Sequence, residues 1–282
     1  MEDEGASDAE KLSVANHLLM SSPPGQFSDV LEDLLKLVPP SILTPESLQA
    51  IARAYNLATA RVVTHEGHSF VLAKEGEVDG SHYLDSGTGK VVEVDHLTCN
   101  TKSSDLSPPQ SDEGLEPLRQ ATEDALDAYR KSLFCAAANS SGAFAMPDGK
   151  LVLYVSGEHL NLRNWWSGSW MGRYEVTGAD GDGLVAITGH INVCGHYFEN
   201  GNMQLRSSRE VPQETLPSAD AAAIIAWIRA KEGELHDSLE GMYGGMSDTL
   251  KGMRRAVTVT ADKFSWQIAQ IRMRNTLLAS KK

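Results

Sequence analysis

The sequence has few cysteines, no long hydrophobic run and no excess of positive charge. Its three cysteines, Cys99, Cys135 and Cys194, form no C-x-x-C pair and cannot all pair within one chain. They therefore predict a reduced, intracellular protein rather than a disulfide-stabilised secreted one. Residues Met1 to Glu4 are acidic and lack the basic-then-apolar order of a signal peptide. The expected location is the cytoplasm.

Two further classes of partner are disfavoured by composition. The most apolar stretch, Ala219 to Ile228, is far shorter than the roughly 20 residues that a membrane-spanning helix needs, so a transmembrane protein is not expected. The 282 residues carry a net charge of −13, whereas nucleic acids are bound by basic surfaces, so no nucleic-acid partner is expected. With 41% hydrophobic and 22% charged residues, the chain reads as an ordinary folded protein.

Catalytic and metal-binding motifs are also missing. The sequence contains no G-x-S-x-G, and no P-loop or G-x-G-x-x-G follows a predicted strand. His190 and His196 are six residues apart on a predicted strand, which separates them by about 20 Å and prevents them from sharing a metal ion. Cys194 with His196 offers only two ligands, and His65 with His68 lacks a third. We therefore expect neither an enzyme nor a bound metal or cofactor.

Three short amphipathic helices separated by proline turns open the chain. The first begins at Ser7, and Glu10 completes a capping box three residues later. The second covers residues 28–38, and the third has Thr44 as its N-cap, followed by a proline at the first helical position. Short amphipathic helices joined in this way favour a small helical bundle, which we assign to residues 1–58.

An α+β class follows from the rest of the pattern. Residues 59–114 hold short strand-like segments and a polar loop and are expected to form a small β-rich unit. Residues 115–217 are expected to form a helix up to about residue 132 and then an antiparallel sheet. The strand-like segments of that sheet lie near residues 134–138, 150–156, 173–176, 184–198 and 203–211.

A long helix is predicted over residues 218–255, with Ser218 as its cap. Five glycines weaken it, so a continuous helix and a helix broken near residues 241–245 both fit the sequence. Residues 256–282 form a separate amphipathic tail.

The end of the chain reverses the charge of the remainder. Residues 251–282 sum to +7 and residues 1–250 to −20. On a helical wheel the tail has two apolar strips on opposite sides, Phe264, Ile268, Ile271 and Leu278 in one and Trp266, Met273 and Leu277 in the other. Basic residues lie between them, namely Lys263, Arg274 and Lys281, with Arg272 on the other flank. By physics alone, docking of the tail on its own body is favoured, and binding of an acidic partner is the alternative.

Three of the five tryptophans cluster in Asn164-Trp165-Trp166 and Trp170. Tryptophan concentrates in cores and at subunit interfaces because it buries a large area with few rotatable bonds. A core or interface position is therefore favoured over a ligand-binding box.

Several blocks together resemble the α subunit of F-actin-capping protein (CapZ). They are Pro23–Phe27 (PPGQF), Tyr83–Asp85 with Asp95–Leu97, Asn164–Trp170 (NWWSGSW), Tyr197–Leu205 (YFENGNMQL), Met246–Thr249, Arg254-Arg255 and Lys263–Trp266 (KFSW). The blocks occur in family order and span nearly the whole chain. Thr258 and Ala261 depart from the pattern, since the family usually has a proline and an arginine there.

The resemblance implies a dimer with a capping-protein β subunit, built from a three-helix stalk, a central antiparallel sheet, a long C-terminal helix and the amphipathic tail. It implies that the chain caps the barbed end of actin filaments in the actin cytoskeleton, blocking monomer addition and loss. The implied actin-binding residues are Lys251, Arg254, Arg255, Lys263, Phe264, Trp266, Ile268, Ile271, Arg272 and Arg274. The implied subunit-interface residues are Trp165, Trp166, Trp170, Tyr197 and Gln204.

Three alternatives stay open at this point. The chain caps an actin-like filament, as the family does within dynactin, or it is a module whose basic tail is regulated by phosphoinositides. A third possibility is that it pairs with a second copy of itself when no β subunit is present.

Overall fold

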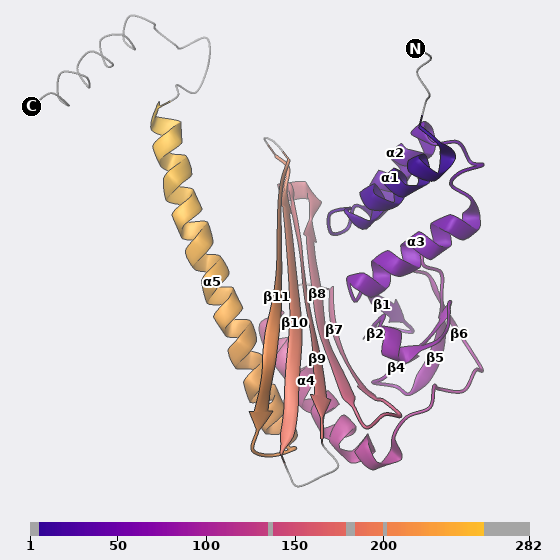
Figure 1. Ribbon diagram of the computed structural model, residues 1–282, viewed down its shortest axis with the longest axis vertical. Helices are drawn as coiled ribbons and strands as arrows, with labels where there is room; N and C mark the ends of the chain where they lie inside the picture. Colours follow the sequence, from indigo (N-terminus) through magenta and orange to yellow (C-terminus); the bar gives the residue numbers. More distant parts are fainter. Residues whose placement is uncertain (1–5, 135–137, 179–183, 200–201, 257–282) are drawn as a thin grey trace, which may run out of the picture. The chain divides into compact units, whose positions relative to one another are not determined.

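A computed structural model of the chain describes residues 6–134, 138–178, 184–199 and 202–256 (Figure 1). Of Leu162, Tyr243 and residues 246–256 it describes the backbone alone. The chain divides into two compact units, residues 1–230 and residues 231–282. Within these described ranges the first unit contains three antiparallel sheets and four complete α-helices, and the second contains most of a fifth.

The first three helices begin within one residue of where the sequence predicts. They are α1 (Asp8–Met20), α2 (Phe27–Leu37) and α3 (Pro45–Ala58). The Ser7 hydroxyl accepts from the Glu10 backbone, and the Glu10 carboxylate accepts from the Ser7 backbone, which confirms the capping box. Thr44 caps α3 as predicted. The helices share one apolar cluster that includes Leu19 of α1, Leu34 of α2 and Ile51 of α3. We refer to them as the N-terminal helices.

Two small sheets follow α3. Strands β1 (Val62–His65) and β2 (His68–Val71) form a hairpin, and a four-stranded sheet contains β3 (Glu77–Asp79), β4 (His82–Asp85), β5 (Lys90–Val94) and β6 (Thr101–Ser103). A short 3-10 turn, Lys74–Gly76, connects them. Nε2 of His96 lies 3.1 Å from the Tyr83 hydroxyl. The backbone carbonyl of His96 accepts a hydrogen bond from the Asn56 side-chain amide at 2.9 Å. This buried polar network fixes α3 against the four-stranded sheet.

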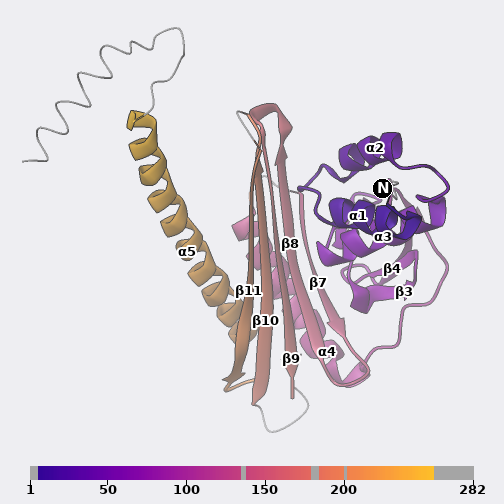
Figure 2. The ribbon, with the colours of Figure 1, turned by 45° about the horizontal axis from the view of Figure 1, so that its top comes forward.

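The central element is a five-stranded antiparallel sheet with strand order β11-β10-β9-β8-β7 (Figures 1 and 2). A 3-10 turn (Glu113–Leu115) leads into α4 (Glu116–Leu133), which precedes the sheet in the chain. The strands are β7 (Ala138–Ala145), β8 (Leu151–Asn161), β9 (Trp166–Thr177), β10 (Val185–Tyr197) and β11 (Met203–Leu216). Sequential antiparallel pairing of this kind makes β7 and β11 the two edges.

The sheet differs from the sequence prediction mainly at its first strand. A strand was expected near residues 134–138, but Phe134 caps the end of α4, and β7 begins only at Ala138. The reason is that β7 (ANSSGAFA) consists mostly of small residues, with Phe144 as its one large hydrophobic side chain. A Cβ on Gly157 of β8 would lie only 2.7 Å from the Phe134 ring. The Phe134 side chain therefore packs on β8, and residue 134 is not part of a strand.

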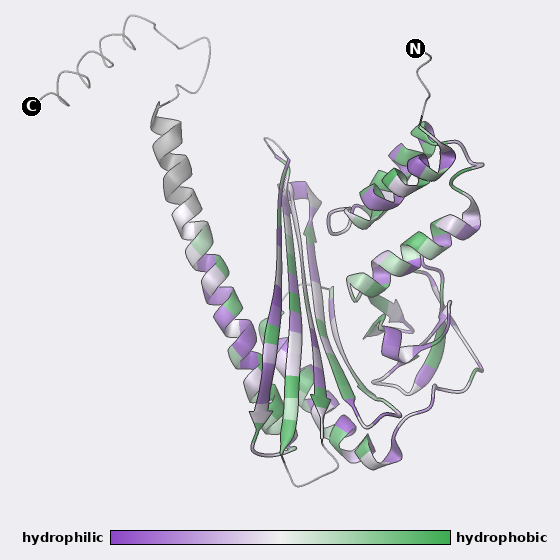
Figure 3. Cartoon of the chain, in the orientation of Figure 1, coloured by the Kyte–Doolittle hydropathy of each residue, from purple (hydrophilic) through white to green (hydrophobic). Residues whose placement is uncertain are grey.

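One face of the sheet is covered by α4 and the start of α5 (Ala221–Ala256). The sheet residues beside α4 are largely hydrophobic, coloured green in Figure 3. Trp227 of α5 stacks edge-to-face on Tyr174 with ring centres 6.1 Å apart, and its indole nitrogen donates to Glu214 at 2.9 Å. Ile224 and Ile228, one turn apart, are fully buried. These contacts lie within the first unit.

Helix α5 is continuous over 36 residues, or about 54 Å. The predicted cap was wrong by two positions, because the helix begins at Ala221 and the Asp220 carbonyl accepts from the Ile224 backbone. The alternative of a break near residues 241–245 does not occur. The space around Gly241, Gly244 and Gly245 is open to 4 Å, so these glycines lower helix propensity without creating a kink.

The opposite face of the sheet contacts the N-terminal helices. We expected a half-exposed face carrying His190, Asn192, Cys194 and His196. The alternation is confirmed, but His196 is only 6% exposed. The backbone carbonyl of Ser21, just after α1, accepts from Arg206 of β11, and the Leu160 side chain of β8 lies against Gly25. The N-terminal helices therefore cover part of this face.

Candidate interaction surface

The predicted actin-binding residues lie at the limit of the described chain or beyond it. Lys251, Arg254 and Arg255 belong to the last turns of α5, where the backbone alone is described. The other seven, Lys263, Phe264, Trp266, Ile268, Ile271, Arg272 and Arg274, lie outside the described residues. Their role in actin binding stays a prediction.

The predicted interface residues lie at the end of the central sheet where two strand connections occur. Between β8 and β9 a 3-10 turn (Leu162–Asn164) is followed by Trp165, whose φ of 63° is in the left-handed region. A non-glycine residue with positive φ is held there by its surroundings. The Phe198 backbone donates to the Trp165 carbonyl at 2.9 Å, and the two rings meet edge-to-face at 5.7 Å. The Trp165 side chain is 48% exposed.

Trp166, Trp170 and Tyr197 share one face of the sheet. Trp166 pairs with Tyr197 across β9 and β10, and Trp170, four residues along β9, points the same way because side chains alternate along a strand. His159 of β8 packs against Trp166 with ring centres 4.6 Å apart. Tyr197 is 39% exposed and faces Met203, which is also exposed. The structure therefore brings these three aromatic residues together on a partly exposed surface, here called the aromatic face.

The indole nitrogen of Trp170 is buried and has no hydrogen-bond partner within the described part of the chain. Buried polar groups are normally paired, and leaving one unpaired costs about 1–3 kcal/mol. The Trp170 indole N–H is thus a buried donor on the aromatic face that has no acceptor among the described residues.

Gln204 lies apart from the aromatic face. It pairs with His196, next to the Tyr197–Met203 pair, and so points to the opposite side of the sheet. It belongs to β11, whose outer side has no partner strand among the residues described. β11 has 14 residues, and the outer side of an edge strand is where a strand of another chain can pair.

Sequence reasoning missed a polar junction between this sheet and the N-terminal helices. Gln26 lies 2.9 Å from Nδ1 of His196, and Nε2 of the same ring lies 2.9 Å from Oδ1 of Asn202. An amide donor on one side and an amide oxygen on the other place the ring hydrogen on Nε2. Gln26 and Asn202 both lie in the sequence blocks that resemble the family. Their presence in those blocks was a signal that could have drawn attention to them, but it does not show that they meet at His196. The ring that we considered as a metal ligand uses both nitrogens for these bonds.

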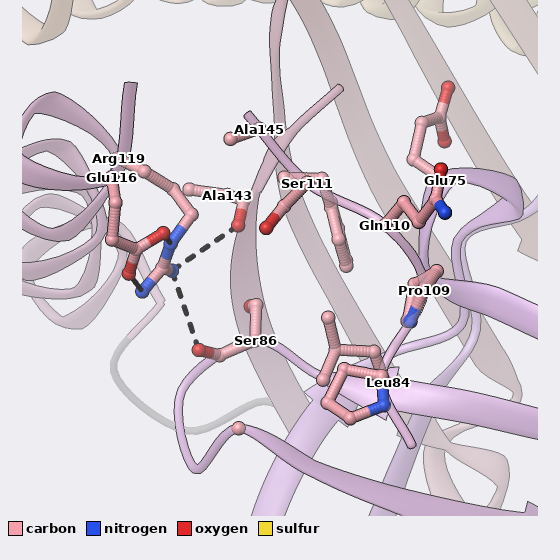
Figure 4. A pocket seen from close by; sticks show the side chains of 13 residues that line it. Glu75, Leu84, Ser86, Pro109, Gln110, Ser111, Glu116, Arg119, Ala143 and Ala145 are labelled. Carbon is pink, nitrogen blue, oxygen red and sulfur yellow. Dashed lines mark hydrogen bonds and ion pairs between the residues drawn. The ribbon is translucent and has the colours of Figure 1, made fainter. Parts of the chain in front are cut away.

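A pocket of about 270 Å³ lies among α4, β7 and the β4–β5 turn (Figure 4). The Arg119 guanidinium makes two bonds to Glu116, at 2.7 and 2.8 Å, and one to Glu123 at 3.0 Å. It also donates to the carbonyls of Ser86 and Ala143, each at 3.4 Å. These bonds occupy the guanidinium with partners from the chain itself. Arg119 therefore connects α4, β7 and the β4–β5 turn and is not a candidate ligand-binding group.

Glu123 is the buried member of that network. Burial raises the pKa of its carboxyl to about 7, although bonds from Ser86, Arg119 and the Ala143 backbone act in the opposite direction. Among the described residues, the hydroxyl group that bonds to Glu123 is that of Ser86, which donates at 3.0 Å. The arrangement stabilises the junction of α4, β7 and the β4–β5 turn.

Metal ligands do not gather in the described residues, where no group of three or more His, Cys, Asp or Glu side chains has the geometry for an ion. Cys99 and Cys194 are free thiols. No helix within the described ranges is long and apolar enough to cross a membrane.

A sequence model of the F-actin capping protein alpha subunit family matches residues 15–276, from α1 into the tail. The chain belongs to this family. The resemblance drawn from the sequence blocks is therefore confirmed. The matched range includes the second half of α1, the other two N-terminal helices, the aromatic face, the edge strand and most of the charge-reversed segment.

Individual relatives match along almost the whole chain. The F-actin-capping protein subunit alpha of Dictyostelium discoideum is 29% identical over 268 residues, which is 93% of this chain and 95% of that protein. The Caenorhabditis elegans protein of the same name is 28% identical over 274 residues, covering 94% and 95%. The structure of the homodimeric actin capping protein alpha subunit from Plasmodium berghei superposes with a TM-score of 0.70 at 21% identity, covering 90% of this chain and 99% of that one. The mixed helix-and-sheet class predicted from the sequence is that of this fold.

Proposed function

We propose that this chain caps the barbed end of actin filaments as the α subunit of a capping-protein dimer, blocking monomer addition and loss. The observation that carries this is the family match over residues 15–276, which covers most of the basic, amphipathic tail. Relatives matching over more than nine-tenths of the chain are named F-actin-capping proteins. Such a protein acts by binding and not by catalysis, and it works at the actin cytoskeleton in the cytoplasm.

The partner subunit is proposed to cover the aromatic face and to pair with β11, the edge strand of the sheet. The aromatic face offers Trp166, Trp170 and Tyr197, and aromatic residues of this kind form the energetic centre of many interfaces. A capping-protein β subunit is the proposed partner. A second copy of this chain is the alternative, since the similar Plasmodium berghei protein is described as homodimeric.

The actin contacts are proposed to come from the charge-reversed segment. Lys251, Arg254, Arg255 and Lys263 supply positive charge, and Phe264, Trp266, Ile268 and Ile271 supply apolar grip, with Arg272 and Arg274 beside them. A +7 segment attached to a −20 body is suited to an acidic protein surface, and charge of this kind speeds encounter. Because the tail is basic and phosphoinositide headgroups are anionic, phosphoinositide lipids are also proposed as regulators of the tail.

Truncation tests this assignment. The full-length chain and a chain ending at Arg255 are each co-purified with the β subunit and compared in a pyrene-actin elongation assay on barbed-end seeds. We expect the truncated dimer to form. The concentration at which it halves the elongation rate should be at least about a hundredfold higher than for the full-length dimer. A chain lacking only Lys281 and Lys282 is the matched control and should cap almost normally. Equal capping by the Arg255 truncation would contradict the role of the tail.

A further inference from the structure

A second cavity lies where the N-terminal helices meet the sheet. Its volume is about 320 Å³, and its walls come from the ends of α1 and α3 and from strands β9, β10 and β11. Cavities that hold small ligands start at about this size and are lined mainly by apolar groups with a few placed polar ones. This cavity is on the opposite side of the sheet from the aromatic face.

All but one of the side chains that line the cavity are apolar or uncharged. Met20 and Ala58 contribute from the helices and Met171 from β9. The Tyr55 hydroxyl donates to the Ser22 carbonyl, and burial raises the pKa of Tyr55 to about 12. Burial also raises the pKa of the Cys194 thiol, outweighing the opposite effect of nearby Arg206. Both groups are therefore neutral walls at physiological pH.

The charge of the cavity comes from Arg206. It is the one charged side chain among the described residues that line the cavity, and it donates to the Ser21 carbonyl. Within the described ranges no carboxylate lies at ion-pair distance from it, and the nearby Glu158 is bonded to Arg61 at 3.1 Å. A guanidinium has five N–H donors arranged to bind a carboxylate, and among the described residues Arg206 uses one of them, in its bond to the Ser21 carbonyl.

We infer that this cavity binds a small organic carboxylate with an apolar body, of the size and chemistry of a medium-chain fatty acid. The apolar body lies between Met20 and Met171, and the carboxylate pairs with Arg206. Charge complementarity favours an anion over an amine, because the cavity holds one cation and no acid among its described lining. The ligand bridges helices and sheet, so it stabilises their junction.

The two methionines provide a direct readout. The full-length chain, co-purified with its partner subunit, is labelled with methyl-¹³C methionine, and the Met20 and Met171 signals are assigned with Met20→Leu and Met171→Leu. Decanoate is then added below its micelle-forming concentration. We expect saturable shifts of both methyl signals, while Met203 on the other face stays unchanged. Absence of a saturable shift of Met20 and Met171 would overturn the inference.

Variants and matched ligands test the role of charge. Arg206→Gln is expected to weaken decanoate binding at least about tenfold, since a charge-assisted bond is lost. Ala58→Leu, which fills the cavity without changing charge, should abolish the shifts. Both variants are first checked for an unchanged circular dichroism spectrum; if Arg206→Gln fails this check, the comparison of decanoate with decylammonium and decanol decides. Equal binding of all three compounds would contradict the proposed carboxylate site.

Discussion

Gln26, in the turn between α1 and α2, lies 2.9 Å from Nδ1 of His196 near the end of β10, 170 residues away. The same ring reaches Asn202, so one imidazole connects the N-terminal helices, the sheet and the start of β11. Its stacking on Phe198, with ring centres 4.9 Å apart, adds the residue whose backbone bonds to Trp165. The junction thus positions the exposed tryptophan relative to the helices.

Breaking this junction should be costly. Gln26→Leu leaves Nδ1 of a buried histidine without its donor, which costs about 1–3 kcal/mol in the free energy of unfolding. The measurement is urea denaturation followed by circular dichroism. His190→Ala is the matched control, because His190 lies on the same strand and face but bonds to the exposed Glu210. Equal losses for Gln26→Leu and His190→Ala would count against the junction.

Glu123 predicts a pH dependence of stability. The pKa of its carboxyl is about 7 in the folded chain, against an ordinary value of 4.5. Between these values the folded state holds a proton that the unfolded state has lost, so stability falls as pH rises from about 4.5 to about 7. The full effect is roughly 3 kcal/mol. Glu123→Gln should flatten this slope in urea denaturation at pH 5 and pH 7.5.

The control variant for Glu123→Gln is Glu116→Gln, which replaces another carboxylate of α4. Hydrogen bonds from Arg119 lower the pKa of Glu116, so that carboxylate is already ionised across this window. Glu116→Gln should therefore leave the slope between pH 5 and pH 7.5 intact. A Glu123→Gln slope that matches the parent would show that another group causes the dependence.

Two glycines should respond in opposite directions to replacement by alanine. A Cβ on Gly189 would lie 2.7 Å from the fully buried Tyr174 ring, so Gly189→Ala should destabilise the chain by about 1–3 kcal/mol. Gly241 has open space around it within α5, so Gly241→Ala should be neutral or stabilise by up to about 1 kcal/mol. Melting temperatures measure both. A destabilising Gly241→Ala would contradict the continuous, open helix.

The aromatic face should govern assembly. Tyr197→Ala removes a half-exposed ring from its centre and should weaken subunit association at least about tenfold, because aromatic anchors dominate interfaces. Native mass spectrometry of the chain co-purified with the β subunit gives the dimer fraction at decreasing concentration. Thr188→Ala, on β10 but on the opposite face, should not change it. Unaltered association of Tyr197→Ala would remove this face from the interface.

Local signals in the sequence predicted most helices but not how they meet the sheet. Ser7 with Glu10 and Thr44 mark their helices because capping is a matter of neighbouring residues. By contrast β7 escaped prediction, since its small residues are buried by what packs on them and not by their own hydrophobicity. Gln26 and His196 show the same limit, because no local pattern links residues so distant in the chain.

The candidate interface was predictable in composition but not in geometry. A tryptophan cluster indicates an interface, but a strand was expected near residues 173–176, whereas β9 begins at Trp166. The strand register is needed to show that Trp166, Trp170 and Tyr197 share a face and that Gln204 points away. The Arg206 cavity had no sequence signal, because its walls come from five separate elements.

Single-filament fluorescence microscopy directly tests the proposal that this chain, with its partner subunit, stops growth at barbed ends, because the two ends of one actin filament are observed separately. We expect nanomolar full-length dimer to halt elongation at the fast-growing barbed end while the pointed end continues to grow. Barbed ends that elongate at the same rate with and without the dimer would contradict it.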